Sequence, residues 1–191
     1  MVTPGVVAAD GGSRYGSSRW RRSRALRAGA ALLLLALGLQ AEPAGAQVVT
    51  TDVKALCASA TIVGTDGHDA IIGTAGDDVI DGGAGNDAID GAGGNDVVCG
   101  GDGFDRLYGG EGDDILCGGG PEGDSLNGGA GNDLLVACGG GVTFQSGGDG
   151  DDRLVGDYGN DNLDGGNGND ACDGGQRRDL AINCEVLINI P

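Results

Sequence analysis

The sequence predicts an all-β chain that folds as a solenoid of stacked nine-residue half-turns. Three observations lead to this prediction: between Gly64 and Gly174 a glycine opens each nine-residue window, an aspartate takes the sixth place, and an aliphatic residue usually takes the eighth. A phase kept over twelve windows indicates a repeat protein, in which each unit buries its apolar residue only by stacking on its neighbours.

The composition excludes an ordinary globular core. Of the 191 residues, 43 are glycine and 4 are proline, and aromatic residues make up 3%. Chains of this kind are disordered unless a strict period lets them bury a narrow continuous core.

The N-terminal residues differ in character from the rest. A basic region over residues 19–27 precedes an apolar run over residues 28–39, and small residues follow at Ala44 and Ala46. This layout is typical of a secretory signal peptide, and the run is shorter than the roughly 20 residues that a membrane span needs. We therefore expect a signal peptide over residues 1–46 and a secreted chain without a membrane span, exported by the general or the twin-arginine route.

Charge points to cations as partners. The chain carries a net charge of −18, and residues 1–46 hold six of its eleven basic and two of its 29 acidic residues, so the remainder carries −22. Such a surface repels nucleic acid, which we exclude as a partner. The six cysteines all lie in the part expected to be exported, where disulfides form.

Each window assigns different tasks to its residues. Its first six residues are expected to turn, because glycine adopts the positive φ angles that a Cβ disfavours. Its last three are expected to form a strand whose middle side chain points inward. The windows begin at Gly64, Gly73, Gly82, Gly91, Gly100, Gly109, Gly119, Gly128, Gly147, Gly156, Gly165 and Gly174.

Such a core is too thin to fold unaided. One buried Ile or Leu contributes roughly 2 kcal/mol, whereas ordering nine residues costs roughly 1–2 kcal/mol each. Calcium is the natural source of the missing stability, because it takes six to eight oxygens from carboxylates and carbonyls in flexible geometry. Magnesium demands a tighter octahedron and fits less well.

The repeated pattern Gly-Gly-x-Gly-x-Asp-x-aliphatic-x resembles the RTX, haemolysin-type calcium-binding nonapeptide family over residues 64–182. The resemblance implies a right-handed parallel β-roll with two nonapeptides per turn. It also implies that several calcium ions sit between successive turns, on loop carbonyls and the sixth-position carboxylate. The implied ligands are Asp69, Asp78, Asp87, Asp96, Asp105, Asp114, Asp124, Asp133, Asp152, Asp161 and Asp170. Asp179 is left out as part of a cap, since Arg177 and Arg178 precede it.

We expect no enzyme. The sequence Gly-Asp-Ser-Leu at residues 123–126 matches an esterase signature, but the one histidine, His68, lies upstream and two of the four residues already belong to the repeat. A zinc protease would need two histidines. His68 itself occupies a turn position where other windows carry Asp or Asn.

The segments outside the repeats are expected to close the ends of the solenoid. Residues 47–63 form an N-terminal segment with a first strand, since Ile62 is in phase with the inward positions, and residues 183–191 form a C-terminal cap. Residues 137–146 are an irregular insertion of one window plus one residue. If they still complete a half-turn, Asp133 and Asp152 lie on the same edge of the roll. If they bulge out, the two lie on opposite edges.

Disulfides are expected, with two alternative partners for Cys99. Cys99 and Cys117 both hold position 9, eighteen residues apart, so they should stack on neighbouring strands about 4.8 Å apart. The resemblance suggests Cys57–Cys99 as the rival, because these two cysteines often occur together in relatives. Cys172 and Cys184 are expected to staple the C-terminal cap.

Two functions compete. The first is a secreted calcium-binding β-roll protein with a structural or surface role, which folds on calcium binding after export. The second is a calcium-dependent adhesin or envelope-associated binding module with an unknown surface partner. Mixed outward side chains in the first repeats, without a threonine or aromatic ladder, disfavour ice or glycan binding; they are Ala70, Ile72, Val79, Asp81, Ala88, Asp90, Val97 and Cys99.

Overall fold

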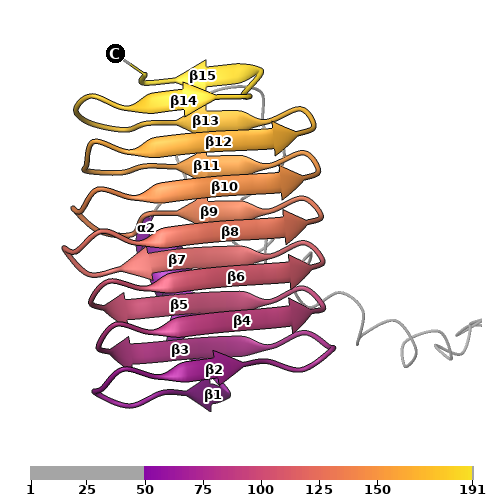
Figure 1. The fold of residues 1–191 in the computed structure, drawn as a ribbon, viewed down its shortest axis with the longest axis vertical. Coiled ribbons are helices and arrows are strands. Elements are labelled where there is room, and N and C mark those ends of the chain that lie inside the picture. Colours follow the sequence, from indigo (N-terminus) through magenta and orange to yellow (C-terminus); the bar gives the residue numbers. More distant parts are fainter. Residues whose placement is uncertain (1–49, 191) are drawn as a thin grey trace, which may run out of the picture.

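The computed structural model describes residues 50–190 as a β-solenoid of about seven turns with one short helix (Figure 1). Successive strands alternate between two parallel sheets that face each other. Sheet A contains β1 (Ile62–Val63), β3 (Val79–Ala84), β5 (Val97–Asp102), β7 (Ile115–Gly119), β9 (Leu134–Val136), β11 (Arg153–Val155), β13 (Ala171–Asp173) and β15 (Val186–Ile188). Sheet B contains β2 (Ala70–Ile72), β4 (Ala88–Gly93), β6 (Arg106–Glu111), β8 (Ser125–Ala130), β10 (Phe144–Asp149), β12 (Asn162–Asn167) and β14 (Leu180–Ile182).

The register confirms that two repeats make one coil. Ile80 pairs with Val98 in sheet A, and Ile89 pairs with Leu107 in sheet B, each eighteen residues further on. The inward eighth-position side chains of both sheets meet in one continuous core, as predicted. Its buried members are Ile80, Ile89, Val98, Leu107, Leu116, Leu126, Leu135, Leu154, Leu163 and Cys172.

The turns are shorter than the sequence suggests. Most interior strands span six residues, from position 7 through position 3 of the next window, rather than three. Positive φ angles recur at positions 2 and 4, for example 97° at Gly83 and 123° at Gly85. A Cβ at Gly85 would lie 2.5 Å from the carbonyl oxygen of Gly67 in the coil before, so only glycine fits there.

Residues 137–146 complete a half-turn, which is the first of the two alternatives that the sequence left open. They supply the start of β10, which pairs with β8 on one side and β12 on the other. Asp133 and Asp152 consequently lie on the same edge of the roll. The insertion also places a polar side chain in the core, because Gln145 is in register with Leu126 and Leu163 and is 2% exposed.

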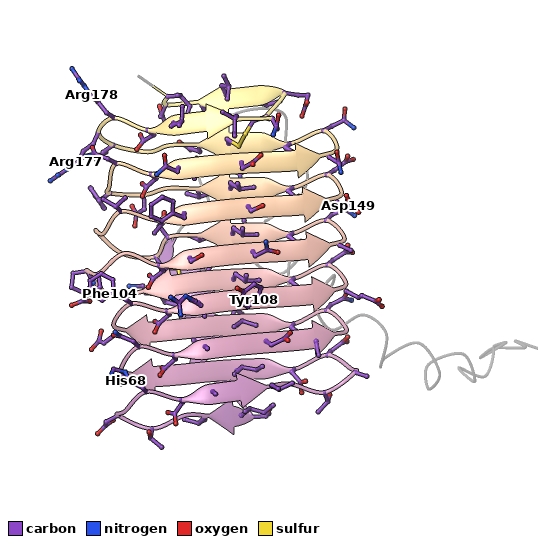
Figure 2. The ribbon with its side chains drawn as sticks, in the orientation of Figure 1. His68, Phe104, Tyr108, Asp149, Arg177 and Arg178 are labelled. Atoms are coloured by element: carbon purple, nitrogen blue, oxygen red, sulfur yellow. A yellow bond between two sulfur atoms is a disulfide. The ribbon has the colours of Figure 1, made fainter. Side chains whose placement is uncertain are left out.

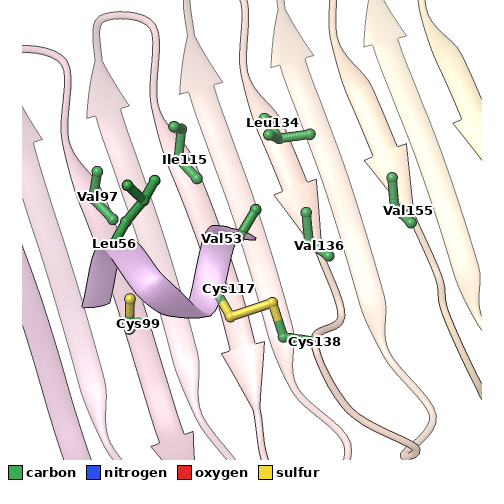
Figure 3. Packing of buried hydrophobic residues seen from close by; sticks show 10 residues of the cluster. All are labelled: Val53, Leu56, Val97, Cys99, Ile115, Cys117, Leu134, Val136, Cys138 and Val155. Carbon is green, nitrogen blue, oxygen red and sulfur yellow. A yellow bond between two sulfur atoms is a disulfide. The ribbon is translucent and has the colours of Figure 1, made fainter. Parts of the chain in front are cut away.

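A helix that the sequence analysis did not predict, α2 (Thr50–Cys57), covers the outer face of sheet A (Figure 3). Val53 and Leu56 pack there against outward side chains of the strands, including Val97, Ile115 and Leu134. The solenoid therefore has a second apolar cluster outside its coils. The spacing of Val53 and Leu56, three residues apart, was the signal in the sequence for this helix.

The disulfides in the structure decide between Cys57 and Cys117 as the partner of Cys99. Cys57–Cys99 joins helix α2 to β5. Cys117–Cys138 joins β7 to the loop that follows β9, and Cys172–Cys184 joins β13 to the C-terminal cap. Cys57–Cys99 and Cys172–Cys184 are confirmed, and the predicted Cys99–Cys117 pair is wrong. Cys99 and Cys117 are direct neighbours in register, but their side chains leave the sheet in parallel, and each meets a cysteine from outside the sheet instead.

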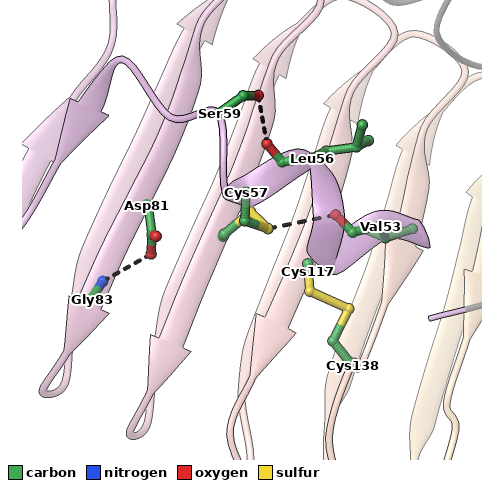
Figure 4. The surroundings of a disulfide bond; sticks show 9 residues. Val53, Leu56, Cys57, Ser59, Asp81, Gly83, Cys117 and Cys138 are labelled. Atoms are coloured by element: carbon green, nitrogen blue, oxygen red, sulfur yellow. Dashed lines mark hydrogen bonds between the residues drawn. A yellow bond between two sulfur atoms is a disulfide. The ribbon is translucent and has the colours of Figure 1, made fainter. Parts of the chain in front are cut away.

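The helix ends next to the first of these disulfides (Figure 4). The hydroxyl and the NH of Ser59 both donate hydrogen bonds to the carbonyl of Leu56, at 2.7 and 3.0 Å. These bonds satisfy a carbonyl that the helix end would leave free.

Both ends of the solenoid carry short strands. Ile62 of β1 pairs with Ile80, and β15 adds to β13. Within residues 50–190, no helix combines the length and the hydropathy that crossing a bilayer requires. The expected signal peptide, residues 1–46, lies outside the described residues.

Candidate metal sites

The sixth-position residues form two rows, one along each edge of the roll where the chain passes between the sheets. The edge that contains His68 and Phe104 is called the His68 edge here, and the opposite one the Asp149 edge (Figure 2). The His68 edge carries Asp69, Asp87, Asp105, Asp124, Thr143, Asp161 and Asp179 in consecutive coils. The Asp149 edge carries Asp78, Asp96, Asp114, Asp133, Asp152, Asp170 and then Glu185.

One carboxylate oxygen of each aspartate holds the row together. The NH of Asp96 donates to Oδ1 of Asp114 at 2.8 Å, and the NH of Asp114 donates to Oδ1 of Asp133 at 2.9 Å. The same bond recurs along both edges. Each carboxylate is thereby fixed by the coil before it.

In most aspartates of the two rows, the other carboxylate oxygen, Oδ2, is buried and has no hydrogen-bond partner among the described residues. This holds for Asp87, Asp96, Asp105, Asp114, Asp124, Asp133, Asp152, Asp161, Asp170 and Asp179. Burying an ionised carboxylate without a compensating charge is strongly unfavourable. A repeated series of such atoms calls for a cation.

Glycine at position 1 makes the space for this oxygen. A Cβ built on Gly82 would lie 2.6 Å from Oδ2 of Asp87 and 2.5 Å from the carbonyl oxygen of Gly100. The two oxygens therefore converge on a space that any larger residue would fill. Carboxylate and carbonyl oxygens are the ligands that calcium takes, so the residues fit this ion.

The profile of the RTX calcium-binding nonapeptide repeat matches four stretches of the sequence, residues 63–98, 100–120, 118–140 and 146–180. Together they cover more than half of the chain. The chain belongs to this RTX family. Proteins with these repeats bind calcium, and the gap between the last two matches falls in the insertion. Neither the curated proteins nor the solved structures contain a match.

Burial raises the pKa of eight carboxylates of the RTX rows, and neighbouring acidic residues add to the effect; they are Asp96, Asp105, Asp114, Asp124, Asp133, Asp152, Asp161 and Asp170. The pKa is raised to about 7 for Asp114, Asp124 and Asp133. It is raised to about 6 for Asp96 and Asp152. Without a cation, the rows therefore oppose folding at neutral pH.

The structure separates the eleven predicted ligands into two groups. Nine of them have the buried, unpartnered Oδ2. At the N-terminal end, Oδ2 of Asp69 accepts hydrogen bonds from the NH and hydroxyl of Thr65, and Oδ2 of Asp78 accepts one from the NH of Thr74. The bonds from Thr65 lower the pKa of Asp69.

Asp179, which the sequence analysis assigned to a cap, has the same geometry as the nine. Its Oδ1 accepts the NH of Asp161 at 2.9 Å, and its Oδ2 is buried without a partner among residues 50–190. Arg177 and Arg178 are exposed and extend outward from the loop (Figure 2). They do not displace the aspartate from the row.

The fifth-position residues form a further ladder on the outside of the turns. Nδ1 of His68 accepts the NH of Asn86 at 2.6 Å, and Oδ1 of Asn86 accepts the NH of Phe104 at 3.1 Å. The prediction that His68 is a turn residue is confirmed. Ser125 of the esterase-like tetrapeptide lies exposed on sheet B, and Asp124 belongs to the row.

No three His, Cys, Asp or Glu side chains converge on a single point anywhere in residues 50–190. The rows place one acidic side chain per coil instead. The remaining oxygens that face each carboxylate come from the main chain, as at Gly100 beside Asp87.

Proposed function

We propose that this chain is a secreted calcium-binding β-roll protein with a structural or surface role, which completes its folding on calcium after export. One observation carries the proposal: two rows of buried Oδ2 atoms that lack a partner among the described residues and lie beside glycine carbonyls. The carboxylates would hold the ions, and bound calcium would supply the positive charge that offsets them.

Export would bring the protein to a calcium concentration at which such sites fill. Calcium sites in extracellular modules have dissociation constants of order 10⁻⁴–10⁻³ M, so they fill where calcium is millimolar and stay empty in the cytoplasm. Three disulfides are compatible with an oxidising compartment. We also propose that the chain has no catalytic role of its own, since Asp124 and His68 are both committed to the repeat.

A calcium titration of the purified chain, followed by circular dichroism, tests the proposal. The β signal should rise with calcium and should not rise with magnesium at the same concentration. A β spectrum that persists in excess chelator contradicts it. N-terminal sequencing of the exported protein tests secretion, with Gln47 expected as the first residue.

The second candidate is a calcium-dependent adhesin or envelope-associated binding module. It is favoured by the outer face of sheet B, which exposes Tyr108 and Phe144.

A further inference from the structure

The two sheets differ on their outer faces. The face of sheet A is apolar and lies under helix α2. The face of sheet B is hollowed by a groove of about 330 Å³ that runs across five of its strands, β6 to β14. Figure 2 looks onto this face, with Tyr108 at its centre.

The groove alternates between large apolar and small polar side chains from strand to strand. Large apolar residues project from β6, β10 and β14, namely Tyr108, Phe144, Leu180 and Ile182. Polar residues project from the strands between them, β8 and β12, namely Ser125, Asn127, Asn162 and Asp164, and Ser146 projects beside Phe144 from β10. The two aromatic residues stand on β6 and β10, two strand spacings or roughly 9.6 Å apart. They are two residues out of register, because Tyr108 is in line with Ser146 and Phe144 with Arg106, so the rings lie diagonally across the face.

This spacing and chemistry fit a sugar chain. The C–H groups of a pyranose ring form an apolar face that packs on an aromatic ring, and its hydroxyls bond to amides, hydroxyls and carboxylates. In an extended β-1,4-linked chain each ring is flipped relative to the last, so the same face recurs at every second sugar. That repeat is comparable to the diagonal separation of the two rings, which combines two strand spacings with two residues along the strand.

The negative charge of the protein favours an uncharged polysaccharide as the ligand of the groove. Asp164 carries the one formal charge among the residues that line the groove, and the whole chain carries −18. An anionic polysaccharide would be repelled, and no cation lines the groove to attract it.

We propose that the outer face of sheet B binds a neutral, extended β-1,4-linked polysaccharide, with Tyr108 and Phe144 as stacking platforms. The inference deepens the second candidate function and rests on the proposed calcium-loaded fold. It differs from the sequence-based expectation against glycan binding, which considered outward residues up to Cys99 and so missed the groove further along.

Isothermal titration of the calcium-loaded chain with cellohexaose tests the inference. We expect binding that is weakened at least about tenfold by Tyr108→Ala with Phe144→Ala, since each aromatic contact contributes about 1 kcal/mol. Tyr158→Ala is the matched control: Tyr158 is 52% exposed, like Tyr108 at 49%, but does not line the groove. Ser125→Trp, which fills the space between the two rings, should also block binding.

Circular dichroism of the same samples separates the two proposals. A calcium-loaded β-roll that ignores cellohexaose overturns the inference and leaves the proposed function standing. Equal affinity in the wild type and the double variant, or preference for carboxymethylcellulose, also overturns it. If the β spectrum is complete without calcium, the proposed function fails while the sugar titration still decides this inference.

Discussion

Thr143 stands in the His68-edge row directly before Asp161. Its NH and its hydroxyl both donate to Oδ1 of Asp161, at 2.8 and 2.9 Å. Thr143 therefore keeps the bond of the row to the following coil but supplies no carboxylate to the coil before it. Ala137 takes the place of the position-1 glycine. Its carbonyl oxygen lies 2.7 Å from a Cβ built on Gly118, as the carbonyl oxygen of Gly100 lies 2.5 Å from a Cβ built on Gly82.

Restoring the missing site should require both positions. We expect Ala137→Gly with Thr143→Asp to bind one additional calcium ion, because the pair provides the carboxylate and the space for its Oδ2. Thr143→Asp alone should not gain an ion, since the Cβ of Ala137 fills that space. Equilibrium dialysis with metal analysis counts the ions, and an equal count in the double variant and the wild type would refute this account of the gap.

Asp114→Asn should change stability in opposite directions with and without calcium. Asparagine keeps the Oδ1 acceptor for the NH of Asp96 but removes a buried charge. In chelator the variant should be more stable than the wild type, and in calcium less stable. Denaturation midpoints under both conditions check this. The control is Asp113→Asn, at an exposed outer position, which should change neither midpoint appreciably; a loss of stability in chelator for Asp114→Asn would contradict the prediction.

Acidification should favour the metal-free fold and weaken calcium binding. The folded pKa of Asp114 is about 7, above the ordinary value of 3.8, so the folded state binds a proton that the unfolded state releases between these values. The destabilising effect is therefore complete above pH 7 and disappears as the pH falls toward 3.8. The β signal in chelator should rise as the pH falls through this window, while the calcium midpoint moves to higher concentration. A β signal in chelator that falls over the same window would show that the carboxylates do not oppose folding.

Gln145→Leu should stabilise the calcium-loaded protein by about 1 kcal/mol. Oε1 of Gln145 is buried without a partner among the described residues, and leucine occupies the neighbouring coils at Leu126 and Leu163. The bond from Nε2 to the carbonyl of Val155 is lost, but that carbonyl also accepts the NH of Ala137 at 2.9 Å. Urea denaturation in saturating calcium measures the change. Gln145→Glu, which adds a buried charge, should destabilise, and a destabilising Gln145→Leu would mean that the side chain has a role in the core.

Leu56→Ala should destabilise the protein by about 2–3 kcal/mol, because it opens a cavity under helix α2. Ala55→Ser, on the exposed side of the same helix, is the control. Chemical denaturation of both variants in calcium checks the difference. If the two behave alike, the cluster over sheet A adds little to stability.

Much of the fold could be predicted from the sequence because the repeats are periodic. Every interior window meets the same neighbours one coil away, so the place of Ile89 or of Asp114 follows from its position in the window. The same translation put Asp133 and Asp152 on one edge once the insertion was counted as a half-turn. For these residues, the position in the nine-residue window is enough to predict the neighbours in the fold.

Tertiary structure alone decided the contacts that involve segments outside the nine-residue repeats. Nothing in the spacing of Cys99 and Cys117 indicates that a helix brings Cys57 onto one and a loop brings Cys138 onto the other. The core position of Gln145 and the free Oδ2 of Asp179 likewise depend on how neighbouring coils pack. By itself, the sequence determined the period, the two sheets and the rows of aspartates. Only packing decided which carboxylate oxygens are buried without a partner in residues 50–190, because burial is a property of all the coils that surround an atom.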